Sequence, residues 1–124
     1  MKLFQIWNAV PAFQTLTALK KNPKLAYSLL KYMKQIESEV AVCEQHRQDC
    51  VYEVSGAARG TPVQIEKGTP QWDEFNAKFQ EFMRTDSDLE AFDLAMGDLI
   101  DALGAETGNV ISEDELELLE PFFN

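Results

Sequence analysis

The sequence contains no apolar run that approaches the 18 residues needed to span a membrane as a helix. Its first four residues resemble the start of a signal sequence. However, Asn8, Pro11, Gln14 and Thr15 interrupt the apolar stretch, and no small-residue cleavage site follows. The chain has 124 residues, of which 45% are hydrophobic and 26% are charged, as in a soluble folded domain. We therefore expect one cytoplasmic domain.

Cysteine and histidine are scarce: the chain has two cysteines and one histidine. On a helix, Cys43 and Cys50 would lie about 10 Å apart along the axis, too far for a disulfide, so we expect reduced thiols. Cys43, His46 and Cys50 would share one helical face and could offer three ligands to zinc. Both cysteines also fall in the apolar register of that helix, which favours buried core thiols over a metal site. We expect no cofactor.

Basic residues are absent after Arg84. Residues 1–84 carry 11 Lys and Arg against 9 Asp and Glu, whereas residues 85–124 carry 12 acidic residues, and the whole chain has a net charge of −10. This asymmetry bears on partners and on solubility rather than on fold. The residues that we expect to contact a partner include an arginine, the first acids of this segment and two late phenylalanines: Arg47, Asp86, Asp88, Glu90, Asp93, Asp98, Asp101, Phe122 and Phe123.

A basic cluster marks the other part of the chain. Five lysines lie close together, with two tyrosines among them: Lys20, Lys21, Lys24, Lys31, Lys34, Tyr27 and Tyr32. They are consistent with a nucleic-acid contact, but such lysines more often form the solvated face of a helix, and the overall negative charge opposes nucleic-acid binding. They could equally face the acidic segment of the same or a neighbouring molecule.

Catalytic motifs are missing as well. The sequence has no G-x-S-x-G motif, no phosphate-binding loop and no evident serine or acid partner for its single histidine. Asp86, Asp88 and Glu90 resemble the first half of a calcium loop, but Ala91 takes the place of the required glycine and Gly97 that of the bidentate glutamate. We do not expect an enzyme.

The clearest element in the sequence is a long amphipathic helix over residues 22–54. Asn22 is a suitable cap and Pro23 suits the first helical position. Arg47 interrupts an apolar register at helical spacing, which is formed by Leu25, Leu29, Met33, Ile36, Val40, Cys43, Cys50 and Val54. A shorter helix from about Asn8 to Lys20 should pack antiparallel to its first half, because the connection is tight. Residues 2–7 could form a short strand or an apolar lead-in.

The rest of the chain divides into three parts. Residues 55–68 should form a loop, with or without a small hairpin. Residues 69–84 should form a helix, because Thr69-Pro70 is a strong helix start and an aromatic stripe follows, formed by Trp72, Phe75, Phe79, Phe82 and Met83.

Residues 85–124 form the acidic segment. Residues 86–103 fit either a helix or an extended run, and a turn should follow over 104–109. The capping box of Ser112 and Glu115 opens a last short helix, which ends at Pro121. The two phenylalanines beyond it should dock onto the core or form part of a partner surface.

Three motifs in this order resemble a group of small helical proteins of unknown function encoded by bacteriophages and prophages. They are the Lys-x-Pro turn at residues 21–23, an Asp-x-Phe-Asn-x-x-Phe-x-x-Phe segment at 73–82, and an Ile-Ser-x-x-x-Leu-x-x-Leu-Glu-Pro-Phe ending at 111–122. The resemblance implies no catalytic residues. It also implies an extended run in place of a helix at residues 89–96.

These observations predict a mainly α, single-domain protein. It should contain an antiparallel helical hairpin with one long helix, a third amphipathic helix packed on that helix, and a small irregular or β-containing C-terminal portion. We expect a non-enzymatic phage or prophage accessory protein that acts as a protein-binding adaptor or assembly factor. It should be located in the cytoplasm of the bacterial host, and association with the virion is the alternative. A homo-oligomer is expected because the apolar register of the long helix outruns its partner helix. The alternative is an acidic inhibitor of a host nucleic-acid-binding protein that works by charge mimicry.

Overall fold

The structure of the protein, a computed structural model, describes residues 1–19, 21–104 and 110–123. This part of the chain is mainly helical, as predicted. Its helices are α1 (Leu3–Ala18), α2 (Pro23–Ser55), α3 (Pro70–Met83), α4 (Met96–Leu103), α5 (Glu113–Leu119) and the 3₁₀ helix η1 (Glu120–Phe122). The predicted end of the first helix at Lys20 and residues 105–109 of the turn predicted over 104–109 lie outside the described residues.

Local sequence signals set the ends of the long helix α2, which was predicted over 22–54. The Leu25 N–H donates to the Asn22 side chain at 2.8 Å, and Pro23 fills the first helical position. Gly56 ends the helix with a φ of 71°, a left-handed conformation that glycine adopts without steric cost. At 1.5 Å per residue, the 33 residues of α2 form a rod of about 50 Å.

The first helix begins earlier than predicted. We expected a strand or lead-in over residues 2–7, but α1 starts at Leu3, so that expectation was wrong. The Lys2 N–H donates to Gln5 Oε1 at 2.7 Å, and the Leu3 N–H donates to the Thr85 carbonyl at 3.0 Å. The hydrogen bond to Thr85 comes from a distant part of the chain, so no local sequence pattern could predict it.

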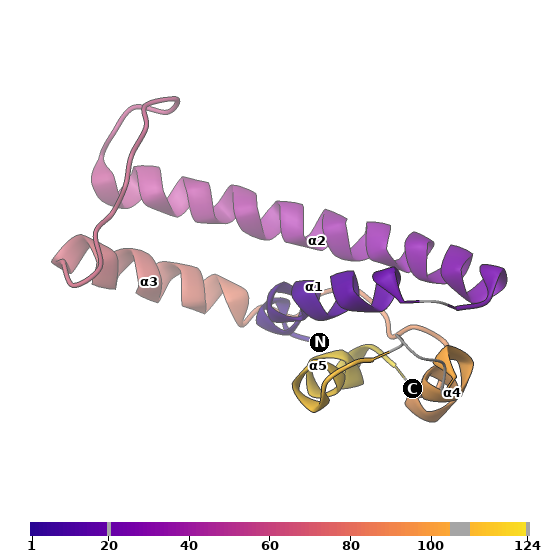
Figure 1. The fold of residues 1–124 in the computed structure, drawn as a ribbon. Helices are drawn as coiled ribbons and strands as arrows, with labels where there is room; N and C mark the ends of the chain where they lie inside the picture. The colour runs from indigo at the N-terminus through magenta and orange to yellow at the C-terminus, as the bar shows by residue number, and fades with distance from the viewer. Residues whose placement is uncertain (20, 105–109, 124) are drawn as a thin grey trace.

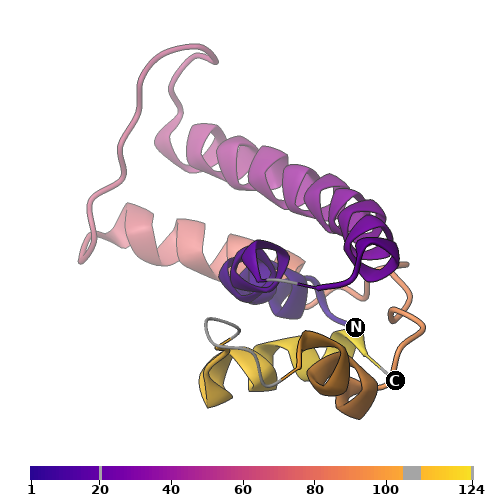
Figure 2. The ribbon, with the colours of Figure 1, turned by 45° about the vertical axis from the view of Figure 1, so that its right-hand side comes forward.

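Helix α1 lies in the middle of the molecule. In Figures 1 and 2 it runs between α2 on one side and α5 on the other, and it packs against both helices. Its buried residues are spread over the length of the helix: Leu3, Ile6, Ala9, Ala12, Phe13 and Leu16. Helix α1 runs back along the N-terminal half of α2, while α3 covers the C-terminal half (Figure 1). We call the end of the molecule where α2, α1 and α5 are stacked the layered end. Residues 40–55 of α2 together with α3 form the arm, because this pair extends beyond the layered end.

Aromatic rings close the layered end around Phe13. The Phe13 ring meets the Phe122 ring edge-to-face, with centroids 4.9 Å apart, and it also lies against Tyr32 and Phe123. Phe122 is fully buried and Phe123 is 7% exposed. The two phenylalanines therefore dock onto the core, and the prediction that they are interaction residues was wrong. Burying them against α1 removes large apolar surfaces from water.

The ambiguous segment after α3 is extended first and helical later. The Ser87 N–H donates to the Met1 carbonyl at 2.8 Å, and the Phe92 N–H donates to the Phe122 carbonyl. These contacts hold residues 86–92 as an extended run, and bends at 93–94 lead to α4, which begins at Met96. Among the described residues, β-structure is limited to two isolated bridges, Lys2 with Asp86 and Phe92 with Phe123. The described part of the C-terminal portion thus consists of irregular segments and short helices. The 55–68 connection contains no hairpin.

Replacing Phe13 should destabilise the fold far more than replacing Phe4 on the same helix. Phe13 is 1% exposed and Phe4 is 40% exposed. We expect Phe13→Ala to lower the free energy of unfolding by about 3–5 kcal/mol, because it leaves a cavity among three rings. Phe4→Ala should cost about 1 kcal/mol or less. Urea denaturation followed by circular dichroism measures both values, and equal losses would contradict the central position of α1.

The Tyr32 hydroxyl should make stability depend on pH in the alkaline range. This hydroxyl donates to the Glu90 carbonyl at 2.7 Å, and burial raises the Tyr32 pKa to about 12. The neutral phenol is therefore favoured in the folded state. Its contribution is complete below the unfolded pKa of about 10 and is lost as the pH rises from 10 to 12.

Tyr32→Phe provides the control for this pH dependence. At neutral pH the variant should be about 1 kcal/mol less stable, because it lacks the hydrogen bond to Glu90. The gap between the two proteins should narrow above pH 10. Denaturant titrations at pH 8 and pH 11 compare them, and a gap of constant size would show that the hydroxyl is not buried as described.

Candidate protein-interaction surfaces

The three candidate zinc ligands on α2 do not converge on one point. Cys43 is fully buried and Cys50 is 2% exposed, so both lie in the core, whereas the His46 ring stacks on the Phe82 ring with centroids 3.8 Å apart. The described residues contain no group of three or more His, Cys, Asp or Glu side chains that could hold a metal ion. Burial raises the pKa of both thiols, which keeps them protonated and poorly reactive.

Arg47, the charged residue that interrupts the apolar register of α2, is engaged within its own helix. Its guanidinium donates to both carboxylate oxygens of Glu44, from Nε at 2.9 Å and from Nη2 at 2.6 Å. This hydrogen bonding holds the Glu44 pKa below its usual value. Arg47 was predicted to be an interaction residue. The structure places it in a bidentate pair that a partner would have to share or break.

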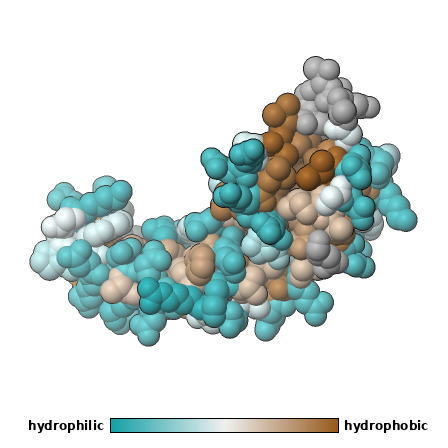
Figure 3. Space-filling view, turned by 90° about the horizontal axis from the view of Figure 1, so that it is seen from below, coloured by the Kyte–Doolittle hydropathy of each residue, from teal (hydrophilic) through white to brown (hydrophobic). Residues whose placement is uncertain are grey.

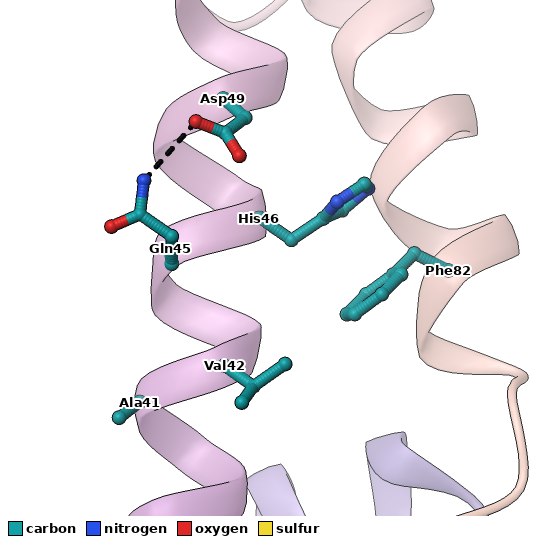
Figure 4. A pocket seen from close by; sticks show the side chains of 6 residues that line it. All are labelled: Ala41, Val42, Gln45, His46, Asp49 and Phe82. Carbon is teal, nitrogen blue, oxygen red and sulfur yellow. Dashed lines mark hydrogen bonds between the residues drawn. The ribbon is translucent and has the colours of Figure 1, made fainter.

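The arm carries a hollow of about 390 Å³ between α2 and α3. Figure 4 shows the His46 and Phe82 side chains facing each other across the gap, with Val42 beside them. Val42 is 56% exposed. Asp49 also lines the hollow, but its carboxylate accepts from Gln45 at 3.1 Å and pairs with Arg59 at 2.7 Å. The surface of the hollow is therefore mainly apolar, and its one carboxylate is already engaged.

The predicted acidic residues lie along the segment from 86 to 101. Asp86 forms an ion pair with Lys2 at 2.9 Å, and this contact lowers the Asp86 pKa. The other residues of the predicted set are exposed between α3 and α4 and on α4: Asp88, Glu90, Asp93, Asp98 and Asp101. Exposed carboxylates of one sign make a strongly negative surface at this end of the molecule.

An apolar groove interrupts this acidic surface. We call it the α4–α5 groove. It has a volume of about 290 Å³ and is lined by Ile100, Leu103, Gly104, Val110, Ile111 and Leu116. Figure 3 shows a hydrophobic patch on this side of the molecule, surrounded by hydrophilic residues. Ile100 is 46% exposed and Val110 is 74% exposed, which is unusual for large apolar side chains.

Acidic residues lie close in the sequence to residues that line the groove. Asp101 directly follows Ile100 on α4, while Glu113 and Glu120 lie three residues before and four residues after Leu116, so they share its helical face. All three acidic residues are exposed. Sequence reasoning missed the groove, and no local signal distinguished Ile100. By helical spacing it shares the face of Met96, Leu99 and Leu103, of which Leu99 and Leu103 are buried.

The basic cluster becomes a smaller surface than the sequence suggested. The Lys21 ammonium turns inward and donates to the carbonyls of Leu16, Thr17 and Leu19 at the end of α1, and Tyr32 is buried. Lys20 lies outside the described residues. What remains is one exposed face of α2, which we call the basic face: Lys24, Tyr27, Leu30, Lys31 and Lys34.

Two large apolar side chains lie on the basic face. Tyr27 is 65% exposed and Leu30 is 56% exposed, and the Lys31 ammonium lies 5.4 Å from the Tyr27 ring centroid. The buried residues of this part of α2, Leu29 and Ile36 among them, lie on its other side. Tyr27 and Leu30 thus point away from α1, whereas Lys24 lies nearer the acidic segment, where it lines a hollow together with residues 92–94 and Ala102 of α4. Among the described residues, no helix is long and apolar enough to cross a membrane.

Both cysteines should resist thiol reagents in the folded protein. Their side chains are at most 2% exposed, and burial raises their pKa, so the thiolate fraction is small. We expect reaction with a disulfide reagent such as DTNB to be slow in buffer and to reach two thiols per chain in denaturant. Rapid reaction of Cys43 in buffer would contradict its place in the core.

The roles of these surfaces follow from their chemistry alone. No protein-family model, no curated protein and no solved structure matches this chain. No residue therefore acquires a role by comparison with known proteins.

Proposed function

We propose that the protein is a non-enzymatic accessory protein that binds other proteins, as an adaptor or an assembly factor. One observation carries this proposal. The molecule presents two exposed apolar patches among charges of opposite sign: Tyr27 and Leu30 on the basic face of α2, and Ile100 and Val110 in the α4–α5 groove. A phage or prophage origin rests on the resemblance of its sequence motifs alone.

The composition of the two surfaces supports protein contacts. Exposed apolar groups gain free energy when a partner covers them, at roughly 25 cal/mol per Å² of apolar surface. Charged residues around such a patch steer a partner of opposite charge and reject partners of like charge. Tyr27 on the basic face and Ile100 in the groove combine these properties, since each lies among charges of a single sign.

Charge mimicry is the second candidate function. In favour of it, the segment from residue 85 onward has twelve acidic residues and no basic one, and most of the described acids are exposed. Such a surface could replace the phosphates of a nucleic acid in the binding site of a host protein. Binding of that kind should depend mainly on charge and weaken steeply with salt.

Affinity capture can separate the two functions. The immobilised protein is incubated with a bacterial lysate at low and at high salt, in parallel with Ile100→Asp and with Val42→Asp as the matched control. Val42 is an equally exposed apolar residue, but it lies on the arm. For an adaptor, we expect a retained protein that Val42→Asp keeps and Ile100→Asp loses by about tenfold or more.

Other results of this experiment have a definite meaning. Retention of a DNA- or RNA-binding protein, lost at high salt and unaffected by Ile100→Asp, would favour charge mimicry. If Ile100→Asp changes nothing in what is retained and salt has no effect, the α4–α5 groove is not the binding site. In that case the adaptor proposal in this form is wrong.

A further inference from the structure

We infer that the partner of the α4–α5 groove is the basic face of α2 from a second copy of this chain. This inference deepens the adaptor proposal, on which it rests, because it names one partner of one surface. The two surfaces belong to the same molecule, yet they do not cover each other, since Tyr27, Leu30, Ile100 and Val110 all remain exposed. A copy therefore cannot satisfy its own groove, whereas a neighbouring copy can.

The chemistry of the two surfaces is complementary. The basic face offers two exposed apolar side chains, Tyr27 and Leu30, and the groove offers exposed apolar surface at Ile100 and Val110. The charges beside these apolar residues are opposite: Lys24, Lys31 and Lys34 on the face, and Asp101, Glu113 and Glu120 at the groove. Contact would cover both apolar patches and pair both sets of charges. Electrostatic attraction and the burial of apolar surface would therefore both favour binding.

The shapes also correspond. The basic face is one side of a regular helix, and Lys24 and Lys34 are ten residues apart, or about 15 Å along the axis. The groove lies between two short helices and continues onto the loop residues Val110 and Ile111. A helix side packed into a groove between two helices is a common mode of protein recognition, in which apolar residues spaced three and four apart supply the anchors. Tyr27 and Leu30, three residues apart, have this spacing.

The arrangement predicts a particular kind of assembly. A contact between two different surfaces is heterologous, so each added copy leaves one free face and one free groove. Such contacts continue as an open chain or close into a ring, and they do not stop at a symmetric dimer. The charge separation within the sequence then has a structural role, because basic and acidic ends of successive copies alternate along the assembly.

Paired variants test this inference directly. Leu30→Asp disables the basic face and Ile100→Asp disables the groove, while Val42→Asp on the arm serves as the control. Circular dichroism of each variant verifies folding, since all three positions are exposed. Masses are measured by light scattering at tens of micromolar protein, at an ionic strength of about 0.05 M and again at about 1 M, where charges are screened within about 3 Å.

We expect the wild-type protein at low salt to have at least twice the mass of the 14.1 kDa chain, increasing with concentration, and to approach the single-chain mass at high salt. Val42→Asp should behave in the same way. Leu30→Asp and Ile100→Asp should each be monomeric alone. When the two are mixed in equal amounts, one intact face meets one intact groove, so the mixture should form dimers and nothing larger.

Several outcomes would overturn the inference. A wild-type protein that stays monomeric at low salt excludes it, and so do disabled variants that assemble like wild type. A mixture that remains monomeric would show that the two surfaces do not bind each other. If the wild type is monomeric but the lysate experiment still shows a protein that only Ile100→Asp loses, the groove has a foreign partner. Self-assembly is then wrong and the adaptor proposal stands.

Discussion

The whole structure depends on burying α1 from two sides. A helix covered on one face can keep the other face polar, but α1 lies between α2 and α5 and has to be apolar on both sides. Each large side chain that it buries contributes roughly 1.5–3 kcal/mol. The remaining elements are placed by this requirement: α2 covers one side, α5 and η1 cover the other, and residues 85–95 link α3 to α4.

Local signals account for the parts of the fold that were predicted well. The N-terminal ends of α2, α3 and α5 are each set by a capping side chain. The Asn22 side chain accepts from the Leu25 N–H, that of Thr69 from the Trp72 N–H and that of Ser112 from the Glu115 N–H. A cap lies within three residues of its partner, so it is visible in the sequence. The helix at 69–84 and the capping box at 112–115 were therefore predicted nearly to the residue.

Long-range contacts account for the parts that were not predicted. The start of α1 depends on a carbonyl more than eighty residues away, at Thr85, and the extended run depends on hydrogen bonds to Met1 and Phe122. The groove was missed for the same reason, because its lining comes from two helices that meet only in the folded chain. The basic cluster was overestimated because Lys21 caps the end of α1 instead of facing solvent. In each case the residue type was visible in the sequence, but its partner was not.

The position of Phe122 and Phe123 against Phe13 has a consequence for biosynthesis. Helix α1 is translated before α5 and η1, so the side of it that faces them is covered only when residues 113–123 have been made. Until then its apolar residues are open to solvent or to chaperones. A ribosome that stalls before residue 113 therefore leaves a chain whose central helix lacks its second layer.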